Sequence, residues 1–494
     1  MEPSADHPTA LAGAQEPRAD ETGRILANTV WRGVAEIGSK LATLALVVVM
    51  ARKLGDAGFG IFTFGFAVAT LVTALGGFGQ DIVVTREVAR DHANLNRYFL
   101  NTLALKSVLA VPALLVASGV ALAVGVDTKT RWVVLLLGVA VVLDLLTLTC
   151  ISVFQAFERL VYMPVVLITE RALTALVGIA ALVAGAGVVA VSAVYAGAAV
   201  VAFVLALIVL YRRIGRPRLT VDTSFWWPFM RVAAPIGITG VFGTVLFRVD
   251  AAILASFGSE QDVGEYGAAF RLFETTLFLS WSVGTAIYPV LSRLTPESDP
   301  PLASVFDRGL KLVVALTLPL AVAAAIVGGP LVELIYGPQF ERTRDALVLL
   351  APAIALYPVA HISGTLLYAR DLQLRMAIAH GIAALANVVM NIVLIAKFGL
   401  EGAAVAASLT WLLLAAVLLR LATRASGAFE ARRVVGGPLL AGAAAAAAMA
   451  ALRGEVVLAL AAGAVTYVTV LVVWEQRLYP DDARALGDFL LRRG

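Results

Sequence analysis

The sequence predicts an all-α integral membrane protein with about fourteen transmembrane helices, each long enough to cross a bilayer. Two observations carry this prediction. Apolar residues make up 60% of the 494-residue chain and charged residues only 15%, a balance far from that of soluble domains. Apolar runs of about 20 residues, the length needed to span ~30 Å of hydrocarbon, also recur along the chain. Because lipid offers no hydrogen-bond partners, each run must satisfy its own backbone groups, which favours helices.

The apolar runs place the spans in order along the chain. The least hydrophobic run, at 435–452, contains a stretch of alanines. The expected spans are 29–50, 58–79, 101–124, 132–154, 162–184, 187–210, 232–256, 266–291, 309–329, 344–367, 373–396, 400–420, 435–452 and 455–475.

Basic residues in the loops predict the orientation. With the N-terminus inside, the cytoplasmic loops and tails hold about 24 Lys and Arg residues against about 8 outside, as the positive-inside rule requires. We therefore expect a multi-pass cell (inner) membrane protein with both termini cytoplasmic. The net charge of +4 is scattered in short clusters, so it indicates topology and no nucleic-acid partner.

The loops divide the chain into two lobes of six spans each. The basic connection between the sixth and seventh spans is the longest cytoplasmic loop. We expect a disordered tail (1–27), an N-lobe (28–211), a basic linker (212–228), a C-lobe (229–422), two further spans (423–476) and a cytoplasmic tail (477–494).

A faint internal repeat supports the two-lobe plan. Leu54-Gly55 followed by Gly60-Ile61-Phe62 has a counterpart in Phe257-Gly258 followed by Gly264-Glu265-Tyr266. Both copies read as a hairpin turn and then Gly-x-aromatic opening a helix. Parallel halves around a central substrate site are a recurring transporter plan.

Charged residues inside spans are costly, at ~2.5 kcal/mol or more each, and should face a cavity or a partner. Arg32, Glu36 and Lys40 of the first span are spaced four residues apart and form one polar stripe within an arc of about 80°. Arg271 and Glu274 of the eighth span, three residues apart, form a second group of charges on one helix face.

The remaining charges in spans complete the candidate site. Arg248 and Asp250 of the seventh span point to nearly opposite helix faces, so both cannot face one cavity. Asp144 lies in the fourth span, and Glu170 and Arg171 lie in the fifth. These acids, together with Glu36 and Glu274, are candidates for charge partners or ion coupling.

The functional interpretation is a cationic chamber between the lobes, lined by Arg32, Lys40, Arg248 and Arg271. Such a chamber would neutralise a pyrophosphate headgroup that hydrocarbon rejects, since Arg binds phosphate through its bidentate fork and Lys as a point charge. The alternative is that these acids and bases pair with one another and only hold the bundle together.

Enzyme chemistry finds little support in the sequence. There is no phosphate-binding glycine loop, no zinc-ligand spacing and no extramembrane segment long enough to fold alone. The single cysteine, Cys150, lies in an apolar run. We expect no cofactor, no metal site and no catalytic residue.

Three pairs of segments resemble parts of bacterial and archaeal polysaccharide flippases. They are Phe247-Arg-Val-Asp250 with Val263-Gly-Glu-Tyr-Gly-Ala-Ala-Phe-Arg-Leu-Phe-Glu274, the first-lobe pair Leu54 to Phe62 and Arg86-Glu-Val-Ala-Arg90, and the late pair Asn387 to Ile395 and Phe398 to Ala404. These flippases belong to the multidrug, oligosaccharidyl-lipid and polysaccharide exporter superfamily. The resemblance implies two six-helix lobes around a central cavity, with two extra C-terminal helices.

The resemblance also implies the activity and partners. The expected substrate is an oligosaccharide on a polyprenyl (pyro)phosphate, moved from the inner to the outer leaflet by alternating access for surface polysaccharide synthesis. H⁺ or Na⁺ is the expected coupling ion, and polysaccharide polymerase or assembly proteins are expected partners. Three alternatives stay open: a lipid II flippase, a cation-coupled multidrug exporter, and a polyprenyl-dependent glycosyltransferase or polymerase.

Overall fold

The chain folds into α-helices joined by short connections. The computed structural model describes residues 19–217, 220–295, 298, 301–427 and 429–479, with the side chains of 19–41 and Leu75 outside that description. In these ranges there are thirteen α-helices and no strand. The helices are α1 (Ala19–Gly77), α2 (Gln80–Arg90), α3 (Leu95–Val124), α4 (Thr128–Ala156), α5 (Tyr162–Val183), α6 (Val188–Arg213), α7 (Trp226–Phe257), α8 (Glu260–Arg293), α9 (Leu302–Tyr336), α10 (Thr343–Ala369), α11 (Gln373–Ser426), α12 (Ala431–Ala451) and α13 (Val456–Leu478).

Two of these helices turn back on themselves. α1 has 59 residues and α11 has 54, and straight helices of that length would reach about 80–90 Å, far beyond ~30 Å of hydrocarbon. Their backbones leave the helical region at Gly55 (φ 72°, ψ −177°) and Gly399 (φ 58°, ψ −130°), positive-φ conformations that glycine adopts without steric cost. Each helix therefore supplies two crossings.

The membrane-crossing segments number fourteen in the described chain. Eleven helices are long and apolar enough to cross a membrane, and α1 and α11 are among them. The turns at Gly55 and Gly399 split those two, and the 34-residue α8 is long enough to span despite its charges. The predicted all-α membrane fold is confirmed, whereas the short α2 makes no crossing.

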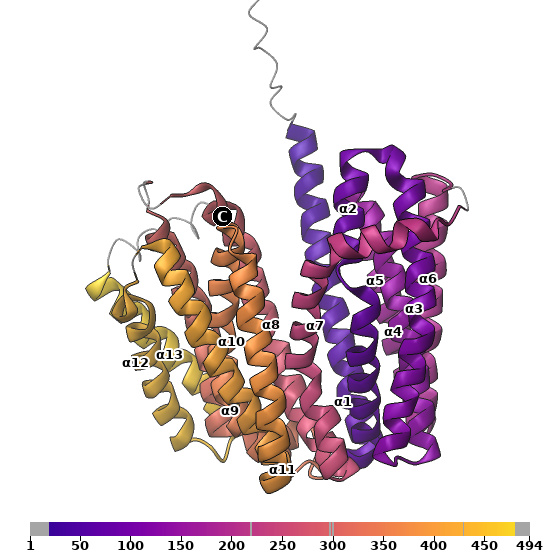
Figure 1. Cartoon of the computed structure of the whole chain (residues 1–494). Helices are drawn as coiled ribbons and strands as arrows, with labels where there is room; N and C mark the ends of the chain where they lie inside the picture. Colours follow the sequence, from indigo (N-terminus) through magenta and orange to yellow (C-terminus); the bar gives the residue numbers. More distant parts are fainter. Residues whose placement is uncertain (1–18, 218–219, 296–297, 299–300, 428, 480–494) are drawn as a thin grey trace, which may run out of the picture.

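The helices form two lobes with a third, smaller group at one edge (Figure 1). In the first lobe α1 packs against α3, α4 and α5, and α4 packs against α6; in the second, α10 packs against α8, α9 and α11, and α11 packs against α7. The lobes meet where α1 contacts α7 and α8, and where α2 contacts α7.

The two ends of the bundle are built differently. We call the end with Gly55 and Gly399 the kink end and the opposite end the α2 end. At the kink end one hydrophobic core contains residues of both lobes, among them Phe59 and Phe340, whose rings meet edge to face at 6.1 Å. At the α2 end one core joins first-lobe helices to the start of α7, with Phe229 and Ala233, and another lies within the second lobe. The described lobes therefore share a broad core at the kink end, whereas at the α2 end α7 is the second-lobe helix that packs into the first-lobe core.

The join at the kink end depends on two glycines. A Cβ placed on Gly60 of α1 would lie 2.9 Å from the Gly264 nitrogen of α8 and closer still to the Glu260 carbonyl oxygen, and a Cβ on Gly264 would meet the Asp56 carbonyl in the same way. The two helix backbones thus touch directly. These glycines are the corresponding positions of the repeat read from the sequence.

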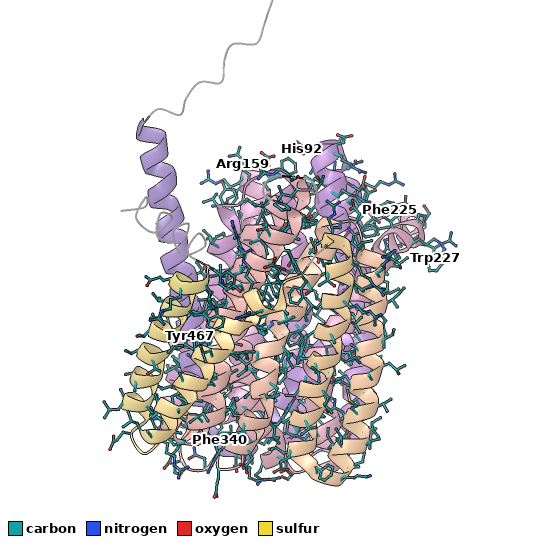
Figure 2. The ribbon with its side chains drawn as sticks, turned by 90° about the vertical axis from the view of Figure 1, so that its left-hand side faces the viewer. His92, Arg159, Phe225, Trp227, Phe340 and Tyr467 are labelled. Atoms are coloured by element: carbon teal, nitrogen blue, oxygen red, sulfur yellow. The ribbon has the colours of Figure 1, made fainter. Side chains whose placement is uncertain are left out.

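The last two helices attach to one lobe. α12 and α13 pack against each other and against α9, and Lys311 of α9 forms an ion pair with Glu475 of α13. Figure 2 shows Tyr467 of α13 on this flank, Phe340 at the kink end, and His92 and Arg159 at the α2 end.

Candidate functional site

Two arginines share one glutamate where the lobes meet. Arg248 of α7 and Arg271 of α8 each place a guanidinium nitrogen 2.9 Å from a different carboxylate oxygen of Glu274. The three side chains keep 17–27% of their surface exposed although they lie within the bundle. We call this cluster the arginine clamp.

The other lobe contributes an aromatic ring to the arginine clamp. Phe66 of α1 lies beneath both guanidinium groups, with Arg248 Cζ 5.1 Å and Arg271 Cζ 5.3 Å from the ring centroid. A ring face attracts cations and partly replaces lost hydration. Two positive groups and one negative group leave the described cluster with a net positive charge, and the contact with Phe66 makes that charge sensitive to how the lobes sit together.

Asp250 lies apart from the arginine clamp in a buried network. Its carboxylate accepts hydrogen bonds from the Tyr266 hydroxyl at 2.7 Å and from Asn391 Nδ2 at 2.6 Å. Asn387 Nδ2 donates to the Thr410 hydroxyl at 3.0 Å, while the Oδ1 atoms of Asn387 and Asn391 are buried with no hydrogen-bond partner among the described atoms. The network therefore holds one buried carboxylate in the same group as two amides whose Oδ1 atoms have no described hydrogen-bond partner.

Asp144 and Glu170 form a third polar group inside the first lobe. Their carboxyl groups, from α4 and α5, are in hydrogen-bond contact, and the charge of Arg171 acts on Glu170. Two carboxyls share a hydrogen bond only when one carries a proton. This group lies in the first lobe, whereas the arginine clamp is built from α7 and α8.

Three predicted site residues belong to α1. Arg32, Glu36 and Lys40 are in its helical backbone, but their side chains lie outside the described part of the structure. The polar stripe predicted for the first span thus stays a prediction.

A cavity of about 580 Å³ opens on the α2-end side of the arginine clamp. Its walls come from α7, α10 and α11, with the junction between α1 and α2 contributing Gly77, Phe78 and Asp81. The lining includes His361 and His380 but neither Arg248 nor Arg271. The described cavity is therefore neutral and aromatic, and the arginine clamp lies beside it.

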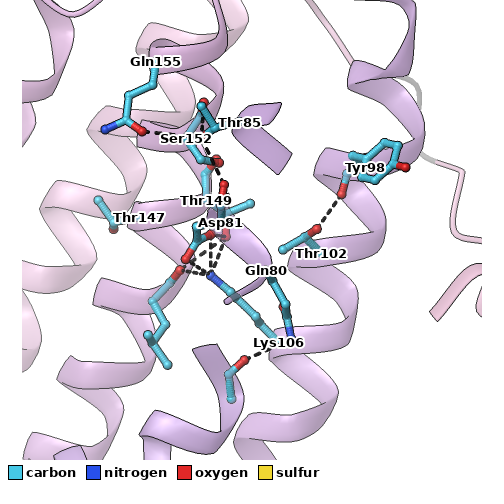
Figure 3. A network of polar contacts seen from close by, with 12 residues as sticks. Gln80, Asp81, Thr85, Tyr98, Thr102, Lys106, Thr147, Thr149, Ser152 and Gln155 are labelled. Atoms are coloured by element: carbon cyan, nitrogen blue, oxygen red, sulfur yellow. Dashed lines mark hydrogen bonds and ion pairs between the residues drawn. The ribbon is translucent and has the colours of Figure 1, made fainter. Parts of the chain in front are cut away.

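One buried ion pair was not among the predicted site residues. Lys106 of α3, 3% exposed, donates to both carboxylate oxygens of Asp81 at 2.7 and 2.8 Å, to the Leu145 carbonyl at 2.8 Å and to the Thr149 hydroxyl at 2.8 Å (Figure 3). The sequence signal was a lysine within the span expected at 101–124. This pair fixes the start of α2, which borders the cavity, to α3 and α4.

No metal centre is formed by the described residues. Nowhere in these ranges do three or more His, Cys, Asp or Glu side chains lie close enough to hold a metal ion. The polar groups that face the cavity or the lobe interface are suited to binding a ligand.

The fold and the arginine clamp define a multi-pass membrane transporter of two lobes around a central site. A family model described as polysaccharide biosynthesis protein matches residues 25–295, and one described as lipid II flippase MurJ matches residues 172–478. The chain belongs to the polysaccharide biosynthesis protein family, within the multidrug, oligosaccharidyl-lipid and polysaccharide exporter superfamily. The resemblance read from the sequence is confirmed.

Two proteins of Haloferax volcanii are similar to parts of the chain. The probable low-salt glycan biosynthesis flippase Agl15 is 26% identical over 175 residues, 35% of this chain and 37% of its own length. The probable flippase AglR is 29% identical over 238 residues, 45% of this chain and 49% of its own length. The match thus spans less than half the length of each relative.

Solved structures share the fold at low sequence identity. Lipid II flippase MurJ in an inward closed conformation has a TM-score of 0.76 at 13% identity, covering 91% of this chain and 99% of its own. An inward-facing multidrug resistance MATE family transporter has a TM-score of 0.62 at 14% identity, covering 79% and 95%.

Proposed function

We propose that this protein is a flippase that moves oligosaccharides linked to polyprenyl (pyro)phosphate from the cytoplasmic to the outer leaflet. In this proposal the α2 end faces the cytoplasm of the cell and the kink end faces outward. Family membership, the flippase names of the two Haloferax relatives and the arginine clamp support it.

The arginine clamp is the observation that carries the proposal. A lipid phosphate must lose its hydration to cross hydrocarbon, which is prohibitive without a fixed positive partner. Arg248 and Arg271 hold their forks toward one carboxylate, Glu274, at 2.9 Å. A phosphate oxygen can take the place of that carboxylate because arginine binds both anions with the same bidentate geometry.

The difference between the two ends supports alternating access as the proposed mechanism. The shared core and the contact between Gly60 and Gly264 close the kink end, while the cavity lies toward the α2 end. A headgroup enters from the α2 end, binds at the arginine clamp, and leaves once the lobes part at the kink end and meet at the α2 end.

Substitution in the arginine clamp tests the proposal. Arg271→Gln removes a charge-assisted hydrogen bond of ~1.5–3 kcal/mol, so flipping of a fluorescent polyprenyl-diphosphate oligosaccharide in proteoliposomes should slow by about 10- to 150-fold. Arg159→Gln, at an exposed loop position, is the matched control and should flip at the wild-type rate. Unchanged flipping by a double Arg248→Gln, Arg271→Gln variant that still reconstitutes would contradict the role of the arginine clamp.

A lipid II flippase is the second candidate, favoured by the match of residues 172–478 to the lipid II flippase model. Both candidates use the same anionic headgroup, so the arginine clamp does not separate them. Proteoliposomes offered lipid II and a polyprenyl-diphosphate oligosaccharide in competition would do so, because the preferred substrate suppresses flipping of the other.

We also propose that Asp250 couples transport to a cation gradient. Its carboxylate and the unsatisfied Oδ1 atoms of Asn387 and Asn391 are hard oxygen ligands of the kind that coordinate Na⁺ at transporter midplanes. Asp250→Asn should abolish the stimulation of flipping by a Na⁺ gradient. If a pH gradient stimulates wild-type flipping and a Na⁺ gradient does not, H⁺ is the coupling ion.

A further inference from the structure

The cavity beside the arginine clamp has two walls of different chemistry. Tyr357, His361 and Tyr368 line it from α10, spaced so that they share one helix face. The glycines of α7 line it from the opposite side. Since α7 contacts α11 and α10 contacts α11, α11 forms the floor between the two walls.

The α10 wall presents fixed aromatic rings. The His361 ring stacks on Tyr357 with centroids 5.7 Å apart and planes 17° apart. Trp281 Nε1 donates to the Tyr357 hydroxyl at 2.7 Å, and the Trp411 ring meets Tyr357 edge to face at 4.8 Å. These contacts hold the Tyr357 and His361 rings in place before any ligand arrives, which limits the entropy lost on binding.

His380 of α11 adds a directed hydrogen-bond acceptor. Its Nδ1 lies 2.9 Å from the Met376 carbonyl oxygen. Because a carbonyl oxygen only accepts, Nδ1 carries the proton in the neutral ring and Nε2 keeps its lone pair. His380 lines the cavity, so this lone pair suits a hydroxyl or amide donor on a ligand.

The α7 wall has two open positions among its lining side chains. Gly240 and Gly243 line the cavity, and a Cβ on either would have no heavy atom within 4 Å. Glycine within a helix costs ~0.5–1 kcal/mol relative to alanine, and no packing contact at these positions demands it. The empty space beside them is therefore available to a ligand.

The cavity carries little charge of its own. Asp81 is the one ionisable acid among its lining residues, and Lys106 holds that carboxylate through two hydrogen bonds. The positive charge of the arginine clamp lies outside the lining. Among the described lining residues there is no cation for a phosphate to bind, and a hydrocarbon chain would leave the histidine and tyrosine polar groups unpaired.

We propose that this cavity, which we call the glycan chamber, binds the first sugars of the lipid-linked oligosaccharide while the arginine clamp holds the phosphate; this rests on the proposed function. The sugar faces pack against His361, which Tyr357 supports from behind, and against the exposed Tyr368, and a sugar hydroxyl or N-acetyl amide donates to His380 Nε2. A volume of about 580 Å³ falls within the ~300–1,000 Å³ typical of ligand sites. Hydrogen bonding to hydroxyl groups gives such a site strong discrimination against ligands that lack them.

The two halves of the ligand can be tested separately. The probes are a polyprenyl diphosphate and the same lipid carrying one N-acetylhexosamine, titrated by calorimetry into the full-length protein in nanodiscs. The wild type should bind the glycosylated probe about tenfold more tightly. Gly240→Leu, whose Cβ meets no heavy atom within 4 Å and whose side chain extends into the glycan chamber, should remove that preference and leave the affinity for the bare probe unchanged. Gly197→Leu of α6 is the matched control, since a Cβ there also meets open space.

His380→Phe in the glycan chamber and Arg271→Gln in the arginine clamp distinguish a failure of this proposal from a failure of the proposed function. His380→Phe preserves ring size but removes the acceptor, so the glycosylated probe should weaken about fivefold, the value of one neutral hydrogen bond. Equal weakening of both probes by Gly240→Leu, no weakening of either, or no wild-type preference would each overturn the glycan chamber. Failure of Arg271→Gln to weaken the bare probe would instead overturn the proposed role of the arginine clamp.

Discussion

The contact between Gly60 and Gly264 allows the sharpest test of how the lobes move. A Cβ on Gly60 would lie 2.9 Å from the Gly264 nitrogen and nearer still to the Glu260 carbonyl, whereas ordinary contacts begin at 3.4 Å. The atoms it meets are backbone, which cannot rotate away. Gly60→Val therefore forces α1 and α8 apart, and overpacking of this kind costs ~1–3 kcal/mol.

That cost falls only on the state in which the kink end is closed. The population should shift by about 5- to 150-fold toward states with a parted kink end, following the usual relation between free energy and equilibrium constant. A weakened helix does not explain such a population shift, because replacing a helical glycine tends to stabilise the helix. Transport should slow as well, since the protein must close the kink end once in each cycle.

Spin labels across the kink end measure this shift. Lys53→Cys and Lys397→Cys place labels at exposed positions in different lobes, and the single native cysteine, Cys150, is buried. Pulsed electron spin resonance should show a longer and broader distance in Gly60→Val. Gly119→Val, where a Cβ meets nothing within 4 Å, should match the wild type. An unchanged distance in a folded Gly60→Val protein would refute the view that this contact seals the kink end.

Three further predictions concern charges. Glu274→Gln leaves the arginines of the clamp without their shared acid and should lower the free energy of unfolding, measured by thermal denaturation, by ~3–5 kcal/mol. Adding Arg248→Gln should recover part of that loss. Strict additivity of the two changes would argue against coupling between the side chains. Lys106→Met strands the Asp81 carboxylate and should cost a similar ~3–5 kcal/mol in detergent unfolding, with partial recovery in the double variant carrying Asp81→Asn. Hydrogen bonding by Thr130, whose backbone N–H donates to Asp127 Oδ1 at 2.7 Å, lowers the pKa of Asp127, the N-cap of α4. The stabilisation by the Asp127 carboxylate is therefore present above the unfolded pKa of ~3.9 and is lost as pH falls through the lower folded pKa. Asp127→Asn, which still caps, should flatten that acid slope in a thermal-shift series.

Much of the fold followed from the sequence because bilayer crossing imposes a length and an apolar composition on every segment. The turns at Gly55 and Gly399 appear as glycines between apolar runs. The opposite orientations of Arg248 and Asp250 were also predictable, since side chains two positions apart on a helix point in directions that differ by about 200°. The ion pair between Asp81 and Lys106 (Figure 3) was harder to predict, because the two residues meet only where α2 folds back onto α3.

The site was predicted in part, for a physical reason. The pairing of Arg271 with Glu274 is local, so the spacing of three residues was enough to indicate it. Arg248 comes from another helix and Phe66 from the other lobe. Their contacts depend on tertiary packing, which a single sequence does not reveal. The glycines and histidines of the described cavity lining were not among the predicted site residues, because such residues in spans are also ordinary packing residues.

The attachment of α12 and α13 has a consequence for how force is shared in the bilayer. Their packing is with α9 and with each other, and the link between Lys311 and Glu475 ties them to the same lobe. In the proposed alternating-access cycle, α12 and α13 move with the second lobe, so that lobe displaces more lipid than the first. The surrounding membrane thus resists the two halves unequally, and its thickness and tension become parameters of the transport cycle.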